Sequence, residues 1–374
     1  MLKIVPIVII CLFLAAFVDL FSSKDSMKNK YVYKEKFLWI FIIIAMSLFA
    51  GLRIKYNDTV TYIYEYEVII NSKLDFSDFN WDLGANPGFR IVAMILKYIG
   101  FSANGYLMFY SIITYTIYIW FIHKYSTDFL MSIFLFICLV FTFPLAAIKQ
   151  CVAVAFCLIA VDKAINKKWF WFIFWILIAE TFHAYSFMYF IVPFLFFVPW
   201  KSKKTYLWIV FFLIIGIMLK PLLGTVLSIT DSLGDNYTLE DFSGEGVNPL
   251  RLAVCLVPLV LSFILRKHIS NTNSEMGRAD NLCLNLSFLN GEIMFVALFG
   301  TANYFARLAN YFYIFPVITL PRLFNMFSPK WRTPIKFAVI VCYFLFFYYW
   351  VCLAHIPFDE EFMSIPISEF RVFV

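Results

Sequence analysis

The chain has 374 residues, of which 63% are hydrophobic and only 14% are charged. A soluble globular chain carries about 25% charged residues, and a soluble fold of this length has too small an interior to bury so much apolar surface. The net charge of +6 is concentrated in one set of loops, so we expect no nucleic-acid partner.

The apolar residues occur in blocks of about 20, the length with which an α-helix crosses the hydrocarbon core of a bilayer. Solid blocks favour helices over the alternating pattern of barrel strands, because a helix satisfies its own backbone hydrogen bonds in lipid. We therefore predict an all-α, polytopic integral membrane protein with a single transmembrane domain over 1–374. The twelve predicted spans lie near residues 3–22, 37–52, 103–122, 129–143, 145–162, 169–182, 184–200, 205–222, 249–265, 281–300, 304–320 and 335–353.

Two apolar stretches need separate interpretation. The first block, Ile4 to Phe21, has a single lysine before it and no A-x-A site after it, so it reads as a retained helix and not as a signal peptide. The stretch near 88–99 is too short to cross a bilayer. We predict that it forms a short re-entrant or interfacial helix.

The basic residues predict the orientation, because cytoplasmic loops of membrane proteins are rich in Lys and Arg. Nineteen of the 30 basic residues lie in one set of loops, which we assign to the cytoplasm. The opposite set includes two long acidic loops near 53–87 and 223–248. With twelve spans, both termini are then expected outside the cytoplasmic membrane.

A group of cations breaks this pattern, because its members lie at or near the outer ends of the spans. Charges within membrane spans are costly and indicate function by default. Several cations on the outer side suggest an anionic substrate, of which phosphate is the usual one. The group consists of Arg53, Arg90, Lys149, Arg251 and Arg307, with Lys97 and Lys220 as weaker members.

Polar neighbours strengthen three of these positions. Arg53 is followed by Asp58 and Thr59, which favours a polar pocket over a simple helix-end anchor. Lys149 and Gln150 fall within a helix that Pro144 is expected to start.

Arg307 is expected to share a helical stripe with amides and phenols, by the i, i+3, i+4 rule. That stripe contains Asn303, Tyr304, Arg307, Asn310 and Tyr311.

His183 interrupts two apolar runs on the predicted outer face. Histidine is the side chain best suited to proton transfer near neutral pH, although an interfacial histidine in a tight turn is the alternative. No P-loop, DxD motif or His/Cys cluster occurs, so neither a cofactor nor a bound metal is expected. The eight cysteines lie in apolar blocks, where they are expected to pack as small apolar side chains.

Four segments in order resemble the EpsG/Wzy-type polymerases of bacterial exopolysaccharide, capsule and O-antigen. The first two are Gly51-Leu-Arg53 with Asn57-Asp58-Thr59 and Tyr62, and Asn86-Pro-Gly88-Phe89. The third is Ile148-Lys149-Gln150, followed by Lys167-Lys168 and by Phe182-His183-Ala-Tyr-Ser186. The fourth is Arg307-Leu-Ala-Asn-Tyr311-Phe312. The family usually has arginine at the position of Lys149, and lysine keeps the charge without the bidentate fork.

The resemblance implies a metal-independent glycosyltransferase on the outer face of the bacterial cytoplasmic membrane. Its donor and acceptor would be oligosaccharide repeat units on undecaprenyl pyrophosphate, and a flippase and a chain-length regulator would be its protein partners. Arg53, Lys149 and Arg307 would hold the pyrophosphate, with Arg90, Gln150, Arg251 and Tyr311 as further binding residues. The base that deprotonates the acceptor hydroxyl would be His183 or Asp58.

Two other classes of membrane protein remain open on the sequence. A lipid-linked oligosaccharide flippase or transporter would also use cations for pyrophosphate, but it would spread them along a central cavity. A membrane acyltransferase that modifies a glycan would place its histidine within reach of a cytosolic acyl donor. Cations gathered on the outer face, together with long outer loops, favour the polymerase.

Overall fold

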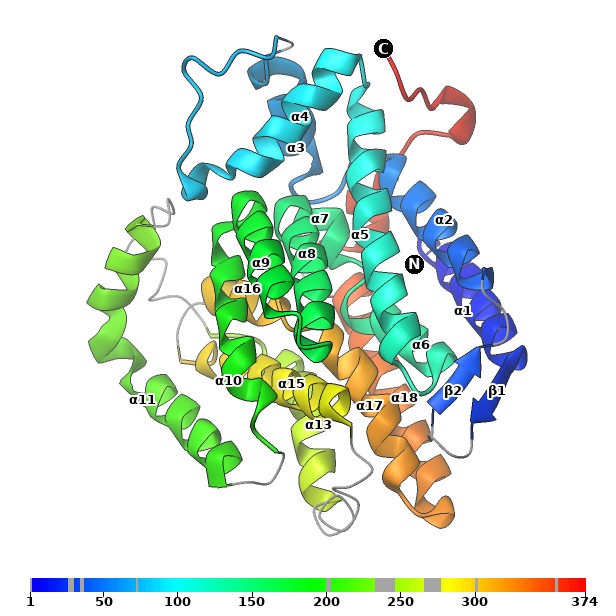
Figure 1. Ribbon diagram of the computed structural model, residues 1–374. Helices are drawn as coiled ribbons and strands as arrows, with labels where there is room; N and C mark the ends of the chain where they lie inside the picture. The colour runs from blue at the N-terminus through cyan, green and yellow to red at the C-terminus, as the bar shows by residue number, and fades with distance from the viewer. Residues whose placement is uncertain are drawn as a thin grey trace. The chain divides into compact units, whose positions relative to one another are not determined.

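A computed structural model describes residues 2–25, 30–33, 37–71, 73–199, 203–232, 246–265, 277–299, 302–353 and 356–374. In these ranges nearly all regular structure is helical, with two short antiparallel β-ribbons, so the predicted all-α class is confirmed (Figure 1). The chain divides into two compact units. The first comprises Met1–Ala160, Ile173–Ser186 and Phe347–Val374, and the second comprises Val161–Phe172 and Phe187–Phe346.

The first unit is built mainly from helices. These are α1 (Val5–Leu20), α2 (Leu38–Gly51), α3 (Thr59–Tyr64), the π-helix η1 (Glu65–Ile69), η2 (Leu83–Ala85), α4 (Pro87–Ile99), α5 (Ala103–Tyr125), α6 (Phe129–Leu139), α7 (Phe143–Ala146), α8 (Ile148–Ile165), α9 (Trp169–Phe182), α19 (Phe358–Glu361) and η4 (Ile367–Glu369). The ribbons pair β1 (Ser22–Asp25) with β2 (Lys30–Tyr33), and β3 (Arg53–Lys55) with β4 (Met363–Ser364). Helix α2 packs against α1 and α5, and α1 also packs against α6.

Local sequence explains where these helices begin and end. The hydroxyl of Ser102 accepts a hydrogen bond from the backbone N–H of Gly105 and so caps α5, and the Asp128 carboxylate caps α6 in the same way. Helix α4 has proline at its first position and ends at Gly100, whose φ of 94° is a left-handed conformation that suits glycine. The predicted short helix near 88–99 is therefore present as α4.

The 356–374 segment folds back over the start of the chain and over β3. Its β4 strand pairs with β3, and the Phe362 ring stacks on Phe49 with centroids 4.7 Å apart. The Lys3 ammonium donates to the carbonyl oxygen of Phe362 at 2.6 Å. The backbone N–H of Asn57 donates to the Glu361 carboxylate at 2.8 Å. Residues 2–3 thus contact the 356–374 segment, which itself contacts the 53–57 region, and Figure 1 shows the segment in red near one end of α5.

The second unit contains η3 (Ala184–Ile191), α10 (Val192–Phe196), α11 (Lys203–Ser232), α13 (Pro249–Ile264), α15 (Arg278–Val296), α16 (Ala302–Asn310), α17 (Ile314–Met326) and α18 (Pro329–Cys352), the first and last of which extend past the unit boundary. Helix α15 is its centre, since it packs against α10, α11, α13, α16 and α17. The predicted outer loop near 223–248 begins within α11, and residues 233–245 lie outside the described ranges.

The number of membrane spans is not confirmed. Among the described residues, only α5 and α18 are both long and apolar enough to cross a bilayer. Seven shorter apolar helices in the described ranges have 10–17 residues, or about 15–26 Å of helix, against a hydrocarbon core of about 30 Å. Turns divide two of the predicted spans, at 140–142 and at 311–313. Each predicted span still coincides with at least part of a helix.

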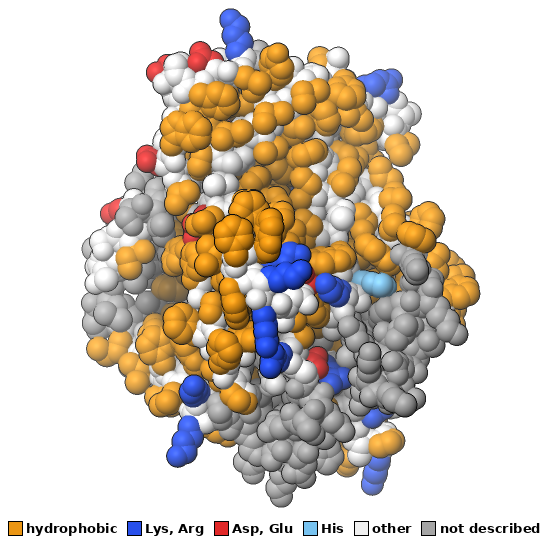
Figure 2. Space-filling view, viewed as in Figure 1, with side chains coloured by type: hydrophobic (Ala, Val, Ile, Leu, Met, Phe, Trp, Pro, Cys, Tyr) orange, Lys and Arg blue, Asp and Glu red, His pale blue; other side chains and the backbone are white. Residues whose placement is uncertain are grey.

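The described surface carries large apolar side chains on many helices. Phe170 of α9, Leu207 of α11 and Phe337 of α18 are each about two-thirds exposed or more, at 74%, 67% and 66%. On the face shown in Figure 2, apolar side chains cover far more of the surface than charged ones do. Exposed apolar surface on this scale marks contact with lipid or protein, so the apolar helices indicate a membrane protein.

We expect Phe362→Ala to release the 356–374 segment, because Phe362 is buried and stacks on both Phe49 and Phe358. The loss of a buried Phe should cost about 3–5 kcal/mol. Thermal unfolding and limited proteolysis of the full chain in detergent would measure both effects. Ile367→Ala is the control, since Ile367 is 65% exposed. Equal behaviour of the two variants would contradict the assigned packing.

Candidate functional site

Arg53 is a fully buried cation that joins two helix ends. Its Nη1 donates to the carbonyl of Ala50 in the last turn of α2, and its Nε donates to the Thr59 hydroxyl at 3.1 Å, at the start of α3. Burial lowers the pKa of Arg53 to about 10, so the guanidinium stays protonated at neutral pH. With 0% of its surface exposed, it reaches no ligand unless the conformation changes.

Lys149 lies in the first turn of α8, because the chain breaks between α7 and α8 at Ala147. Its ammonium is 3.2 Å from the carboxylate of Glu65, and it lies 5.5 Å and 5.4 Å from the ring centroids of Tyr62 and Phe89. Cation–π contacts of this length are attractive. The side chains of Lys149 and Glu65 remain 22% and 34% exposed, so a ligand can reach both. We call Lys149, Glu65, Tyr62 and Phe89 the Lys149 cluster.

Tyr62 connects the cluster to its surroundings. It interacts electrostatically with Arg53, Asp58 and Glu65. Burial raises the pKa of its phenol, and the negative charge of Asp58 raises that pKa further, so Tyr62 stays neutral near pH 7. Asp58 itself is exposed at the N-terminus of α3, and its side chain does not cap that helix. The structure therefore places Arg53, Asp58 and Lys149 around one tyrosine.

His183 lies in the turn that follows α9. The backbone N–H of His183 donates to the carbonyl of Ala179, and the His183 carbonyl accepts from the N–H of Ser186, both at 3.0 Å. Its half-buried ring lies 5.6 Å from the ring of Tyr185. Gly88 packs directly on Thr181, two residues before His183, so the start of α4 meets the end of α9.

Arg90 follows one turn into α4 and is half-buried. Gln150 is buried in α8. Lys97, at the other end of α4, donates to three backbone carbonyls, those of Tyr66, Glu67 and Ile70, at 2.8, 2.9 and 2.6 Å. These three hydrogen bonds give Lys97 a structural role at the end of η1. The side chain of Lys220 lies outside the described part of the chain.

A second polar cluster belongs to the second unit. Arg251 of α13 donates from Nε to the Tyr313 hydroxyl at 2.8 Å and from Nη2 to Asn310 Oδ1 at 2.9 Å. These bonds tie α13 to the turn between α16 and α17. Asn310 is buried, and the Arg251 guanidinium supplies a hydrogen-bond donor to its side-chain oxygen.

The predicted stripe on α16 does not continue past Asn310. The helix ends there, so Tyr311 lies in the turn, where it is fully buried and its carbonyl accepts from the Tyr189 hydroxyl at 2.6 Å. Arg307 is exposed. The side chains of Asn303 and Tyr304 lie outside what the structure describes.

Sequence reasoning does not single out Glu65 or Tyr313 as polar-site residues, and it includes Tyr62 only within a segment of the family resemblance. Glu65 is one of several acids in the predicted loop near 53–87, and only the helical structure within that loop distinguishes it from the others. Tyr62 follows Asp58 by four residues, the spacing of one helical face. Tyr313 gave no local signal, because its partner Arg251 is far away in the sequence.

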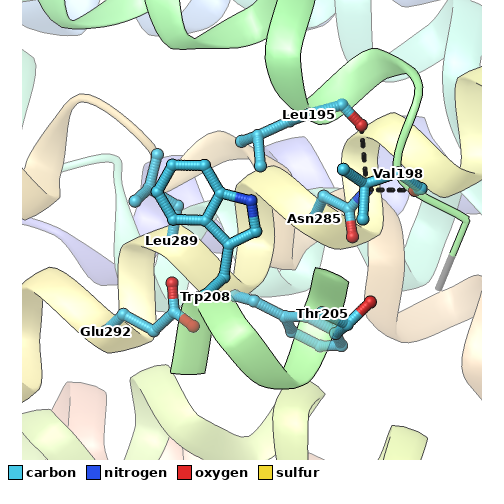
Figure 3. Close-up of a pocket in the computed structure, with 8 residues that line it drawn as sticks. Leu195, Val198, Thr205, Trp208, Asn285, Leu289 and Glu292 are labelled. Carbon is cyan, nitrogen blue, oxygen red and sulfur yellow. Dashed lines mark hydrogen bonds between the residues drawn. The ribbon is translucent and has the colours of Figure 1, made fainter. Parts of the chain in front are cut away.

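A pocket within the second unit lies among α10, α11 and α15 (Figure 3). Asn285 Nδ2 donates there to the carbonyls of Leu195 and Val198 at 3.1 and 2.8 Å, and Glu292 points toward the Trp208 side of the pocket. The cavity measures about 20 Å³, which is room for one water molecule. It is too small for a sugar, so it is a poorer candidate for substrate than the Lys149 cluster.

Among the described residues, no group of three or more His, Cys, Asp or Glu side chains is placed to hold a metal ion. The family model described as the EpsG family matches residues 36–364. This match covers most of the chain, so the protein belongs to the EpsG family. No curated protein and no solved structure matches the chain.

Gly88→Ala should destabilise the junction of α4 and α9, because the new methyl group would overlap the Thr181 hydroxyl. Overpacking of this kind typically costs about 1–3 kcal/mol. Thermal unfolding in detergent would measure it, with Gly224→Ala as the control, since a Cβ at Gly224 meets no atom within 4 Å. An unchanged midpoint for Gly88→Ala would refute the close contact.

Glu292→Met should stabilise the protein by about 1–3 kcal/mol, because a buried polar group without a partner is costly. Glu292 is 8% exposed and makes no hydrogen bond or ion pair with the other described residues. Denaturation of the purified chain would test this, beside Glu369→Met at an exposed position. A loss of stability would mean that the carboxyl group holds a ligand or water in the cavity.

Proposed function

We propose that this EpsG-family protein is a polysaccharide polymerase. It transfers a glycan from undecaprenyl pyrophosphate onto the sugar end of a second lipid-linked repeat unit, at the outer face of the bacterial cytoplasmic membrane. Family membership supports a polymerase-type function. The observation that carries the proposal is Lys149, a partly exposed cation at the N-terminus of α8 whose carboxylate partner is also exposed.

This position suits a leaving group that gains negative charge. The N-terminus of a helix carries a partial positive charge that favours anions. Lys149 adds a full charge in the same turn, and its location beside aromatic rings limits its hydration. Together they would stabilise lipid pyrophosphate as the glycosidic bond breaks.

The other predicted cations take different parts in this proposal. Arg53 is buried and holds α2 to α3, so it positions the helix that carries Tyr62 and supplies positive potential. Arg251 braces the turn after α16. Arg90 and Arg307, with Gln150 and Tyr311, remain proposed binding residues. His183 and Asp58 are the bases that the sequence suggests for the acceptor hydroxyl.

Tyr62 and Glu65 of the Lys149 cluster fall within the predicted outer loop near 53–87, which supports a site on the outer side of the membrane. Residues 2–3 contact the 356–374 segment, and that segment contacts the 53–57 region, which supports the proposal that both termini share the outer side with the site. The lipid-linked donor and acceptor would reach the site there. A flippase and a chain-length regulator are proposed partners.

Lys149→Ala should lower polymer formation by about 100-fold or more, the usual cost of removing one charge-stabilising group. The assay would follow polymer length in a strain lacking the chromosomal copy and complemented with each variant. Lys149→Arg should retain part of the activity, because it keeps the charge. Lys124→Ala is the matched control, since Lys124 also lies over an aromatic ring, 5.0 Å from that of Trp120, in the last turn of α5 at the end assigned to the cytoplasm.

The same strain separates the polymerase from a flippase. Without a polymerase, single repeat units should accumulate on the outer leaflet of the membrane. Accumulation on the inner leaflet would instead assign the protein to transport, and normal polymer with Lys149→Ala would remove Lys149 from the reaction.

A further inference from the structure

Glu65 occupies an unusual backbone position. It is the first residue of the π-helix η1, where the chain leaves the regular turns of α3. Short π-helical segments within helices are rare and occur often at functional sites. The Lys97 ammonium holds this turn by donating to the carbonyls of Tyr66, Glu67 and Ile70. The widened turn is therefore held by three hydrogen bonds to residues that follow Glu65.

The Glu65 carboxylate has one ion-pair partner among the described residues, the Lys149 ammonium at 3.2 Å. Tyr62 and Tyr106 also interact with it electrostatically. Both members of the ion pair are partly exposed, and pairs of this kind contribute only about 0–1 kcal/mol. An arriving polyanion can therefore take Lys149 from Glu65 at little cost.

We infer that Glu65 is the general base of the transfer reaction and that Lys149 exchanges Glu65 for the pyrophosphate of the donor. This inference rests on the proposed polymerase function. In the resting protein the pair neutralises both charges. When pyrophosphate binds Lys149, the carboxylate is released beside the bound donor, where it can accept a proton.

The acceptor hydroxyl gives its proton to the Glu65 carboxylate, and its oxygen forms a bond to the anomeric carbon of the donor glycan. The bond from that carbon to the phosphate oxygen breaks, and its electron pair leaves with the lipid pyrophosphate, held by Lys149. Glu65 then returns the proton to water and pairs again with Lys149.

Geometry favours Glu65 over the two bases that the sequence suggests. Glu65 contacts the cation that would hold the leaving group, so one binding event can both stabilise that group and free the base. Asp58 is exposed at the start of α3, one turn before the cluster. His183 lies in the turn after α9 and packs near Tyr185.

The test uses the purified full chain in detergent with lipid-linked repeat units extracted from the deletion strain. Glu65→Gln should lower kcat by about 100-fold or more, the contribution of a general base, with KM changed far less. Glu65→Asp should retain partial activity. Glu67→Gln is the matched control on the same turn, where its side chain is exposed and its backbone carbonyl still binds Lys97.

Binding of inorganic pyrophosphate, followed by thermal shift, is the second measurement. Glu65→Gln should bind it at least as tightly as the unmodified protein, because Lys149 loses its competing carboxylate, and Lys149→Gln should bind it several-fold more weakly. If the unmodified protein makes no polymer, the proposed function itself fails. If it does, and Glu65→Gln matches its kcat while His183→Ala or Asp58→Asn does not, Glu65 is not the base.

Discussion

Helix ends in an apolar chain leave backbone carbonyls that water cannot reach, and much of the polar structure of this protein answers that constraint. The last four carbonyls of an α-helix have no partner within the helix, and a buried carbonyl without a donor costs free energy. Arg53 donates to a carbonyl at the end of α2, and Lys97 donates to three at the end of η1. Asn285 does the same for the carbonyls of Leu195 and Val198.

Because of this constraint, a polar residue in a membrane sequence does not by itself indicate a functional site. Such residues are costly in lipid and therefore suggest function, but a broken helix offers them a structural use. The shorter a chain's helices are, the more ends it has and the more donors it needs. Here many apolar helices have 10–17 residues, so several polar side chains donate hydrogen bonds to backbone carbonyls at helix ends. Lys149 differs, because its described ion-pair partner is a carboxylate and both groups are partly exposed.

The sequence predicted the parts of the fold that depend on local composition. Continuous apolar blocks gave the helices and the all-α class, and Pro87 with Gly100 bounded α4. Helix breaks were harder to predict, because the turn at 311–313 consists of aromatic residues that fit either a helix or a turn. Tyr311 lies in this break and is buried, whereas Arg307 lies on α16 before it and is exposed. Among site residues, Lys149 and Arg53 stood out as charges in apolar surroundings, whereas Glu65 depended on a contact across 84 residues of sequence.

The contrast between Arg53 and Lys149 shows how two cations in one unit can have different uses. A guanidinium keeps its charge even when fully buried, and Arg53 uses that property to fix α3 and the residues that follow it. An ammonium that is 22% exposed and paired with a 34% exposed carboxylate is weakly held and exchanges partners readily. In the proposed reaction, buried Arg53 would therefore set the geometry in which Lys149 exchanges its partner. Because η1 is held in turn by Lys97, the Glu65 carboxylate meets Lys149 from a backbone fixed on both sides.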